Sequence, residues 1–268
     1  MRVMARNVDR ARGLLPTSTE IVEGDLRDAQ SVEAEMAGVQ AVHVNLENAM
    51  TRRRPEWDPD ADGAVTVLRI AESMGESGPR RMSRTSALGI DHPDCDWWPT
   101  RAKLETDQAW LDSPVETTVF RPTWFMESLP LFVRNGLLML TRMQETRLHW
   151  VAGDDYARMV HAAFDMPAAA NRAYLAQGPE LLSTREAARR FVAARPERIR
   201  VVSIPAWIMR LAGLAAPPVG YLMNLMDATA KCFAPIDAAR EENDLPDAVI
   251  TIEGYAMSID ETGDWPKK

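Results

Sequence analysis

The stretch Arg121-Pro122-Thr123-Trp124-Phe125-Met126, with the run Val-Glu-Thr-Thr-Val-Phe at 115–120 in front of it, decides the fold. The β-branched run predicts a buried strand, and we expect an apolar helix to follow it as far as Leu140. Open α/β sheets bind their ligands at the carboxyl ends of their strands. A functional site would therefore be built at this junction.

Short apolar runs alternate with helical patterns before this stretch. The predicted strands cover residues 2–5, 20–23, 40–45 and 80–86, and the predicted helices cover 8–15, 31–37, 62–74 and 100–111. Alternation at this spacing predicts a doubly wound α/β fold with a parallel sheet and right-handed crossovers. We place this main domain at 1–140.

Beyond residue 140 the elements become shorter. The predicted strands there are 149–151, 173–175 and 200–204, and the predicted helices are 154–164, 183–194 and 205–233. Ser183 and Glu186 match the pattern of a capping box. We therefore predict a smaller α+β region at 141–268, packed on the carboxyl edge of the sheet.

The composition excludes several classes of protein. A net charge of -8 and a pI near 5.2 argue against a nucleic-acid surface. The four histidines are scattered, and Cys95 and Cys232 lie far apart, so we expect neither a metal site nor a disulfide framework. No run of apolar residues is long enough to span a membrane. We expect a cytoplasmic protein.

Five further segments carry a resemblance to a known family. They are Ala5-Arg6-Asn7, Glu23-Gly24-Asp25-Leu26, the Ala-Gly-Val-Gln-Ala-Val run at 37–42, Ala102-Lys103-Leu104-Glu105 and the run from Trp150 to Met159. In this order they resemble the NmrA-like atypical short-chain dehydrogenases, and the strand before Arg121 resembles the last Rossmann strand of that family. The resemblance covers residues 2–210 and implies an NAD(P)-binding Rossmann fold.

The resemblance implies a binding site for the adenosine half of the nucleotide. Arg6 would meet the adenosine 2′-phosphate, for which a guanidinium is the suitable partner. Asp25 and Leu26 would flank the adenine, and Asn45 and Leu46 would pass near the ribose and the pyrophosphate. NADP(H) is therefore favoured over NAD(H).

The resemblance also implies a catalytic end. Ser86 would be the serine at the end of a strand, and Lys103 would hold the nicotinamide ribose. Pro122, Thr123 and Trp124 would back the nicotinamide. Hydride transfer in an active member would occur beside Thr123 and Trp124, with Ser86 and Lys103 orienting the ribose or a carbonyl group.

The start of the chain departs from the family pattern. The family opens with a strand and a Gly-rich turn, whose backbone amides hold the pyrophosphate. No Gly-x-Gly occurs in this sequence, which starts at what resembles the second strand of the family. The missing strand is central in the sheet. Either the sequence is a truncated reading frame or another segment fills the gap, and residues 248–252 are the candidate.

Two other departures bear on activity. Active short-chain dehydrogenases use Tyr-x-x-x-Lys, in which the lysine lowers the pKa of the phenol. Pro99 stands four residues before Lys103, although many NmrA-like proteins also lack this tyrosine. The predicted strand at 80–86 is also polar, with Ser83, Arg84 and Thr85 in succession, which is costly if both faces are buried.

The sequence leaves three interpretations open. The first is an NAD(P)-binding oxidoreductase acting on an unknown small molecule, favoured if Trp97, Trp124 and Phe125 form an apolar pocket. The second is a non-catalytic NAD(P) sensor that works through a protein partner, favoured by the absent tyrosine. The third is a truncated member of the family that binds no nucleotide. No Gly-x-Ser-x-Gly elbow is present, which disfavours a hydrolase.

Overall fold

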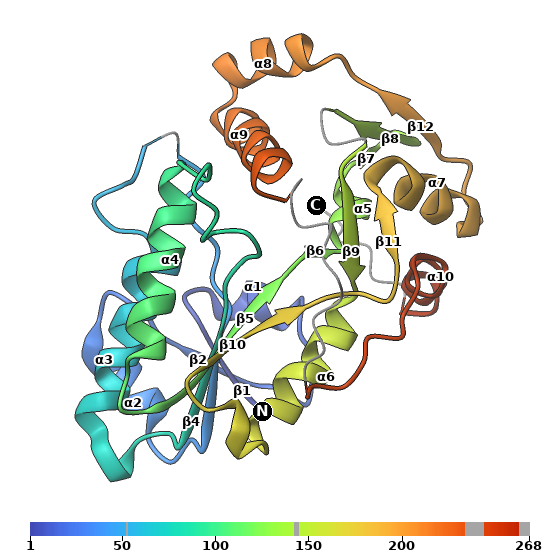
Figure 1. Ribbon diagram of the computed structural model, residues 1–268. Helices are drawn as coiled ribbons and strands as arrows, with labels where there is room; N and C mark the ends of the chain where they lie inside the picture. The colour runs from blue at the N-terminus through green and yellow to red at the C-terminus, as the bar shows by residue number, and fades with distance from the viewer. Residues whose placement is uncertain (52, 142–144, 234–243, 263–268) are drawn as a thin grey trace.

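A parallel four-stranded sheet forms the centre of the computed structural model, which describes residues 1–51, 53–141, 145–233 and 244–262 (Figure 1). Its strand order is β10-β5-β4-β3. These strands are β3 (Ala41–Val44), β4 (Arg81–Thr85), β5 (Glu116–Pro122) and β10 (Arg172–Ala176). The registers place Phe120 opposite Thr85 on one side and opposite Tyr174 on the other. The prediction of a parallel α/β fold is confirmed.

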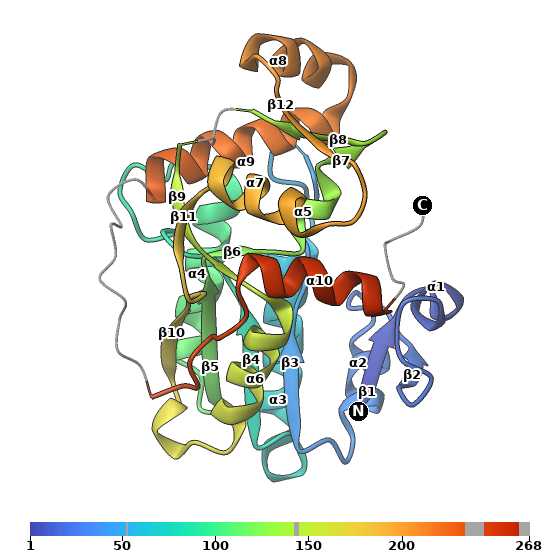
Figure 2. The same ribbon diagram turned by 90° about the vertical axis from the view of Figure 1, so that its right-hand side faces the viewer.

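Helices cover both faces of this sheet, as a doubly wound fold requires. One face is covered by α2 (Ala29–Met36), α3 (Ala64–Met74) and α4 (Trp98–Leu111), and the other by α6 (Gly153–Phe164) (Figure 2). Trp110 of α4 is fully buried on the first face. Tyr156 of α6 meets Phe120 edge to face on the second, with ring centroids 5.6 Å apart.

A second, two-stranded parallel sheet lies beside the first (Figure 2). It consists of β1 (Arg2–Ala5) and β2 (Glu20–Glu23), with α1 (Val8–Arg12) between them. Among the described residues, β1 pairs only with β2 and β3 pairs only with β4. No described strand therefore joins the two sheets.

The candidate segment for this gap lies elsewhere. Residues 248–251 form no strand, and Ile252 begins α10 (Ile252–Thr262). The backbone amides of Val249 and Ile250 donate to Asp155 Oδ2 at 2.9 and 2.8 Å. Asp155 is buried at the first turn of α6, so these two hydrogen bonds hold the segment against α6. The expectation that it completes the sheet is wrong.

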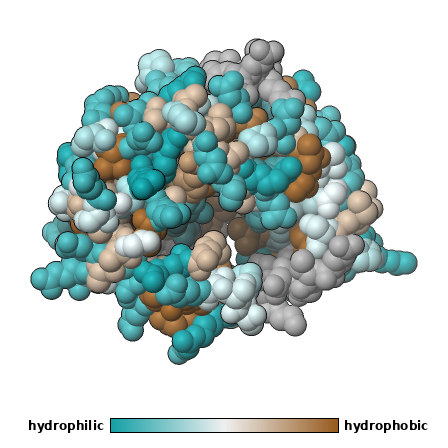
Figure 3. Space-filling model, turned by 90° about the horizontal axis from the view of Figure 1, so that it is seen from below, coloured by the Kyte–Doolittle hydropathy of each residue, from teal (hydrophilic) through white to brown (hydrophobic). Residues whose placement is uncertain are grey.

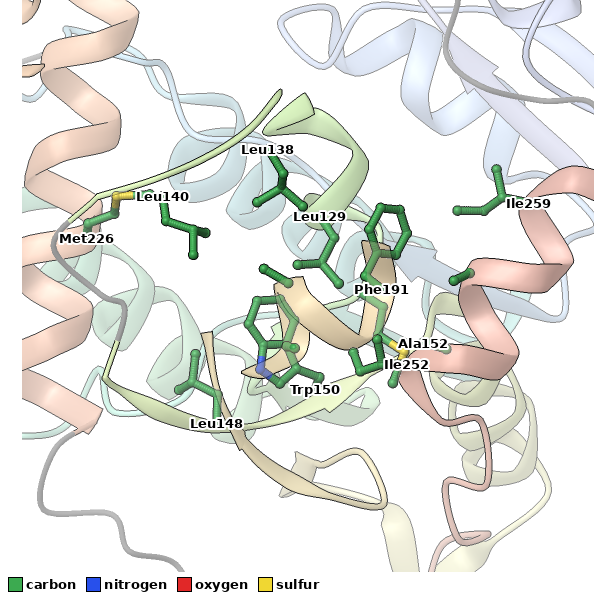
Figure 4. Close-up of a cluster of buried hydrophobic side chains, with 14 of the residues drawn as sticks. Leu129, Leu138, Leu140, Leu148, Trp150, Ala152, Phe191, Met226, Ile252 and Ile259 are labelled. Atoms are coloured by element: carbon green, nitrogen blue, oxygen red, sulfur yellow. The ribbon is translucent and has the colours of Figure 1, made fainter. Parts of the chain in front are cut away.

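The part of the chain after β5 builds two small sheets around a third core. They are β11-β9-β6, made of β6 (Trp124–Phe125), β9 (Arg147–Val151) and β11 (Leu181–Ser183), and β12-β8-β7, made of β7 (Val133–Arg134), β8 (Leu137–Leu140) and β12 (Arg200–Ser203). This part also contains the helices α5 (Ser128–Leu131), α7 (Thr184–Ala194), α8 (Ala206–Ala215) and α9 (Pro217–Phe233), and α10 packs against the same core. Trp150, Phe191 and Leu129 lie at the middle of their shared core (Figure 4).

The predicted helix from the Arg-Pro stretch to Leu140 is wrong. The helix there is the four-residue α5, and β7 and β8 follow it as an antiparallel hairpin. Asn135 and Gly136 connect the two strands with φ angles of 50° and 74°. Asn-Gly is the residue pair that such tight hairpin turns favour, because both positions need positive φ. The turn signal therefore outweighs the apolar run.

Three short helical turns complete the described elements: η1 (Pro59–Gly63), which is a π-helical turn, η2 (Gly75–Ser77) and η3 (Pro167–Ala169). No helix in the described ranges is both long and apolar enough to cross a bilayer. The described residues also hold no group of three or more side chains that could bind a metal ion. One face is mainly hydrophilic and is hollowed near its centre (Figure 3).

The sequence predicts no disulfide framework, but Cys95 is disulfide-bonded. The other cysteine of the sequence is Cys232, and its side chain lies outside the described part of the chain.

Gly178 provides a test of the packing between β10 and β9. A Cβ atom at this position would overlap the carbonyl group of Trp150. We expect Gly178→Ala to lower the free energy of unfolding by about 3 kcal/mol, because neither backbone can move away freely. In a thermal melt this corresponds to a fall in Tm of roughly 6–12 °C.

Gly13→Ala is the matched control. Its φ is -74°, and the closest atom to an added Cβ is 3.5 Å away, so we expect little change in Tm. Equal melting curves for the two variants would contradict the close approach of Gly178 to β9.

Candidate functional site

A cavity of about 270 Å³ opens at the carboxyl ends of β4 and β5. The start of α4 forms one wall, and α9 forms another. Trp97, Trp124, Phe125 and Tyr221 contribute aromatic surface to its lining. Ser86, Lys103 and Thr100 are among the few polar side chains that reach it. The cavity is thus apolar with polar groups at one end, the usual composition of a small-molecule site.

The ends of two neighbouring strands place its polar and aromatic residues. Ser86 follows the last residue of β4, and its amide donates to the carbonyl of Phe120 at 2.7 Å. Thr123 follows the last residue of β5, and its amide donates to the carbonyl of Ala176 at 3.1 Å. Trp124 continues into β6. The backbone pairing of the strands therefore fixes where these side chains begin.

A buried charge network lies directly beneath this cavity. The guanidinium of Arg84 is fully buried in β4 and donates to Asp107 Oδ1 and, at 3.3 Å, to Asp60 Oδ1. Asp107 Oδ2 accepts from Ser86 Oγ at 2.9 Å and from Arg121 Nε at 3.1 Å. Burial raises the pKa of Asp107, while Arg84, Ser86 and Arg121 act in the opposite direction. The network offsets the cost of burying a charged strand.

Asp60 carries the network to Lys103. The Nζ of Lys103 donates to Asp60 Oδ2, and the side chain of Lys103 is 15% exposed, at the cavity lining. Asp60 belongs to η1, a single π-helical turn of a kind often found at functional sites. The side chain of Asp58 caps this turn and also accepts from Asn48 Nδ2 at 3.0 Å. Asn48 in turn lines the cavity.

The polar side chains on the second face of β4 are also satisfied. His43 Nδ1 lies 2.8 Å from Ser83 Oγ, and His43 Nε2 lies 3.2 Å from Thr85 Oγ1. Thr85 Oγ1 also lies 2.7 Å from the hydroxyl of Tyr156. Burial lowers the pKa of His43 to about 4. His43 is thus a neutral, hydrogen-bonded and partly buried residue, and the polar strand is buried without unpaired charge.

Five of the predicted site residues meet at the cavity: Ser86, Lys103, Pro122, Thr123 and Trp124. The other five lie at the carboxyl ends of β1, β2 and β3 and do not line it. They are Arg6 after β1, Asp25 and Leu26 after β2, and Asn45 and Leu46 after β3. The roles assigned to all ten remain predictions.

Among these outer residues, Arg6 and Asn45 are exposed, and the others are partly buried. No hydrogen bond or ion pair involves the guanidinium of Arg6 within the described ranges. The carboxylate of Asp25 accepts from the backbone amide of Arg27 at 3.0 Å. Leu26 and Leu46 pack against the core beneath α2 and α3. Arg6 is therefore a cationic group at this edge that is free to meet a ligand.

Comparison with known proteins identifies a nucleotide-binding family. The sequence profile of a family described as NAD(P)H-binding matches residues 1–166. The chain belongs to this NAD(P)H-binding family. The NAD(P)-binding Rossmann family that the resemblance implied is confirmed by this match.

Two curated relatives are reductases. One is a (4-alkanoyl-5-oxo-2,5-dihydrofuran-3-yl)methyl phosphate reductase of Streptomyces griseus, 27% identical over 82% of this chain and 74% of its own. The other is an NAD(P)H azoreductase of Xenophilus azovorans, 25% identical over 87% of this chain and 77% of its own.

Two solved structures share the fold. An NADPH-dependent quinone oxidoreductase of Escherichia coli, solved with NADPH, superposes with a TM-score of 0.71 at 16% identity, over 98% of this chain and 90% of its own. A triphenylmethane reductase of Citrobacter sp., solved with NADP(H), gives 0.69 at 17% identity, over 96% and 89%. At this identity the likeness concerns the fold alone.

The described residues fit the two ends of a nicotinamide dinucleotide. The apolar cavity, with Ser86 and Lys103 at its polar end, suits a nicotinamide ring and its ribose. The exposed, unpartnered Arg6 suits a phosphate. The Gly-rich turn that would hold the pyrophosphate has no counterpart between β1 and β3 in the described chain. The described residues therefore fit the nicotinamide and the 2′-phosphate ends of the dinucleotide, but not its pyrophosphate.

Sequence reasoning missed the acidic partners and one wall of the site. Asp107 lies inside a predicted helix and Asp60 just before another, positions where a carboxylate usually faces solvent, and Tyr221 lies far along the chain on α9. One signal was present: an arginine in the middle of a predicted buried strand requires buried acidic partners. The identity of those partners depends on tertiary packing.

His43 gives a pH-dependent test of the buried polar face. Its folded pKa of about 4 lies below the unfolded value of 6.5, so below pH 6.5 the unfolded chain binds a proton that the folded chain does not. The free energy of unfolding should therefore fall as the pH falls from 6.5 to 4, by about 3 kcal/mol from this residue.

The check is urea unfolding of wild type and His43→Gln at pH 7.0, 5.5 and 4.5. The glutamine does not titrate. The difference between the two proteins in how the free energy of unfolding changes with pH therefore isolates the contribution of His43. Parallel curves for the two proteins would show that His43 is not held neutral by burial.

Proposed function

We propose that this protein is an NADPH-dependent reductase of a small, apolar, unsaturated molecule. The observation that carries the proposal is the cavity at the carboxyl ends of β4 and β5, where Ser86 and Lys103 meet a wall of aromatic side chains. A chain of the NAD(P)H-binding family with such a cavity has the parts that a reductase needs at its nicotinamide end.

The residues that line the cavity divide the tasks of binding the nicotinamide and the acceptor. Lys103 and Ser86 hold the nicotinamide ribose or orient a carbonyl group, and Pro122, Thr123 and Trp124 back the ring. A bound, reduced nicotinamide would supply two electrons and one proton, as a hydride, to an acceptor in the cavity. The aromatic walls exclude water from that acceptor and select flat, apolar molecules. The curated relatives, which are named as reductases, support this class of reaction.

Asp60 positions Lys103 for this role. Its carboxylate takes the Nζ of Lys103 on one oxygen and Arg84 on the other. The ammonium is thereby held in place beside the cavity by a buried anion. Because Asp60 is itself fixed by Arg84, Lys103 keeps one orientation before any ligand arrives.

The preference for NADPH is assigned to Arg6. Its guanidinium is exposed at the carboxyl end of β1 and has no partner among the described residues. A guanidinium binds a phosphate through two parallel hydrogen bonds, which the 2′-hydroxyl of NADH cannot match.

The test is a titration with NADPH and with NADH, followed by energy transfer from the eight tryptophans to the nicotinamide. We expect micromolar binding of NADPH. Arg6→Ala should weaken NADPH by about ten- to a hundredfold, the range for a hydrogen-bonded charged group, and should leave NADH nearly unchanged.

Arg189→Ala is the control, because Arg189 is another exposed arginine and lies on α7. Equal weakening of NADPH by both variants would overturn the role of Arg6. Failure of wild type to bind either nucleotide would overturn the proposed function.

A non-catalytic nucleotide sensor acting through a protein partner is the second candidate. Pro99 occupies the place of the usual tyrosine, so the helix of Lys103 supplies no phenol. Saturable binding of NADPH without turnover of any quinone, azo compound or unsaturated carbonyl compound would favour the sensor.

A further inference from the structure

One phenol faces this cavity from another part of the chain. Tyr221, on the first turns of α9, lines the same cavity as Lys103 and Ser86. Its ring rests on Trp97, with centroids 5.0 Å apart and an angle of 50° between the planes. The side chain is half-buried, and Met223 and Met226 of the same helix are buried and fix the position of α9.

The hydroxyl of Tyr221 is available to a ligand. Among the described residues no hydrogen bond to this hydroxyl occurs. Burial raises its pKa, and the carboxylates of Asp58, Glu47 and Asp60 raise it further. The phenol therefore keeps its proton at neutral pH and can act as a hydrogen-bond donor.

We propose that Tyr221 is a catalytic residue of this cavity, whose hydroxyl donates a hydrogen bond to the oxygen of an aromatic carbonyl compound and then supplies the proton for its reduction. The inference rests on the proposed function and names the class of its substrate. Trp97 is the positioning residue, since its ring supports that of Tyr221.

The chemistry of the cavity selects this class. Trp97, Trp124 and Phe125 offer flat apolar surfaces, which suit an aromatic ring. The positive charge of Lys103 is already neutralised by the carboxylate of Asp60, so this end of the cavity has no unpaired cation to attract an anionic ligand. A neutral oxygen acceptor that needs one donor therefore matches the site better than a carboxylate or a phosphate.

Reduction of a carbonyl group to an alcohol consumes two electrons and two protons. A bound, reduced nicotinamide would supply two electrons and one proton, as a hydride, so the alcohol product needs one further proton. The O–H bond of Tyr221 breaks, and a new O–H bond forms on the former carbonyl oxygen. The phenolate that remains recovers a proton from water. This places on α9 the function that a tyrosine four residues before Lys103 serves in active short-chain dehydrogenases.

The experiment uses two ligands of the same shape in the absence of nucleotide. Acetophenone carries a carbonyl oxygen, and α-methylstyrene replaces that oxygen with a CH₂ group. Quenching of tryptophan fluorescence measures the affinity of each for wild type and for Tyr221→Phe. We expect the variant to bind acetophenone about three- to tenfold more weakly, the range for one hydrogen bond. Its affinity for α-methylstyrene should be unchanged.

Tyr255→Phe is the matched control. Tyr255 lies on α10 and stacks on Phe191, away from the cavity, so both ligands should bind as to wild type. In assays with NADPH and an aromatic ketone, Tyr221→Phe should lower kcat at least a hundredfold with a smaller change in KM.

The outcomes separate the two proposals. Equal affinities of wild type and Tyr221→Phe for acetophenone, or equal losses for both ligands, would overturn the role of Tyr221, and so would failure of both ligands to bind. The ligand measurement needs no nucleotide, so a selective loss for acetophenone upholds the donor role even if NADPH does not bind. In that case the proposed function fails alone.

Discussion

The fully buried guanidinium of Arg84 is the constraint on which the rest of the structure depends. It stands in β4, between β3 and β5, where both faces of the sheet are covered by helices. A charge in that position is tolerated only with close partners of opposite sign. Asp107 from α4 and Asp60 from η1 are those partners, so the network ties the helix and the π-helical turn to the strand.

The same network prepares the site. Each carboxylate that faces Arg84 turns its other oxygen to a group at the cavity: Asp107 to Ser86, and Asp60 to Lys103. Ser86 and Lys103, which the proposed function needs, are thus oriented by the same carboxylates that offset the cost of burying Arg84. Stability and preorganisation have a single origin here, which is the arrangement expected when a functional group is supported by a buried polar shell.

Much of the main fold could be predicted from the sequence. The alternation of short β-branched runs with helical spacing is a local signal, and it located β1 to β5 and the helices between them. The stretch between Thr123 and Leu140 could not be predicted in this way, because a short apolar run fits a strand or a helix equally well. There the Asn135-Gly136 turn decided for a hairpin. The segment at 248–252 failed for a different reason, since Asp155 from a distant helix binds its amides.

The site was predicted in part for the same reasons. Ser86 and Thr123 follow strand ends, and a strand end can be found in a sequence. Asp60 and Tyr221 reach the cavity only through tertiary packing, and nothing in their local sequence marks them.

The most direct test of the central constraint is a double-mutant cycle of Arg84→Met and Asp107→Asn, with the free energy of unfolding measured in urea. A coupling energy of about 2–3 kcal/mol is predicted, because each group is costly to bury without the other. Effects that add to within about 0.5 kcal/mol would contradict the account.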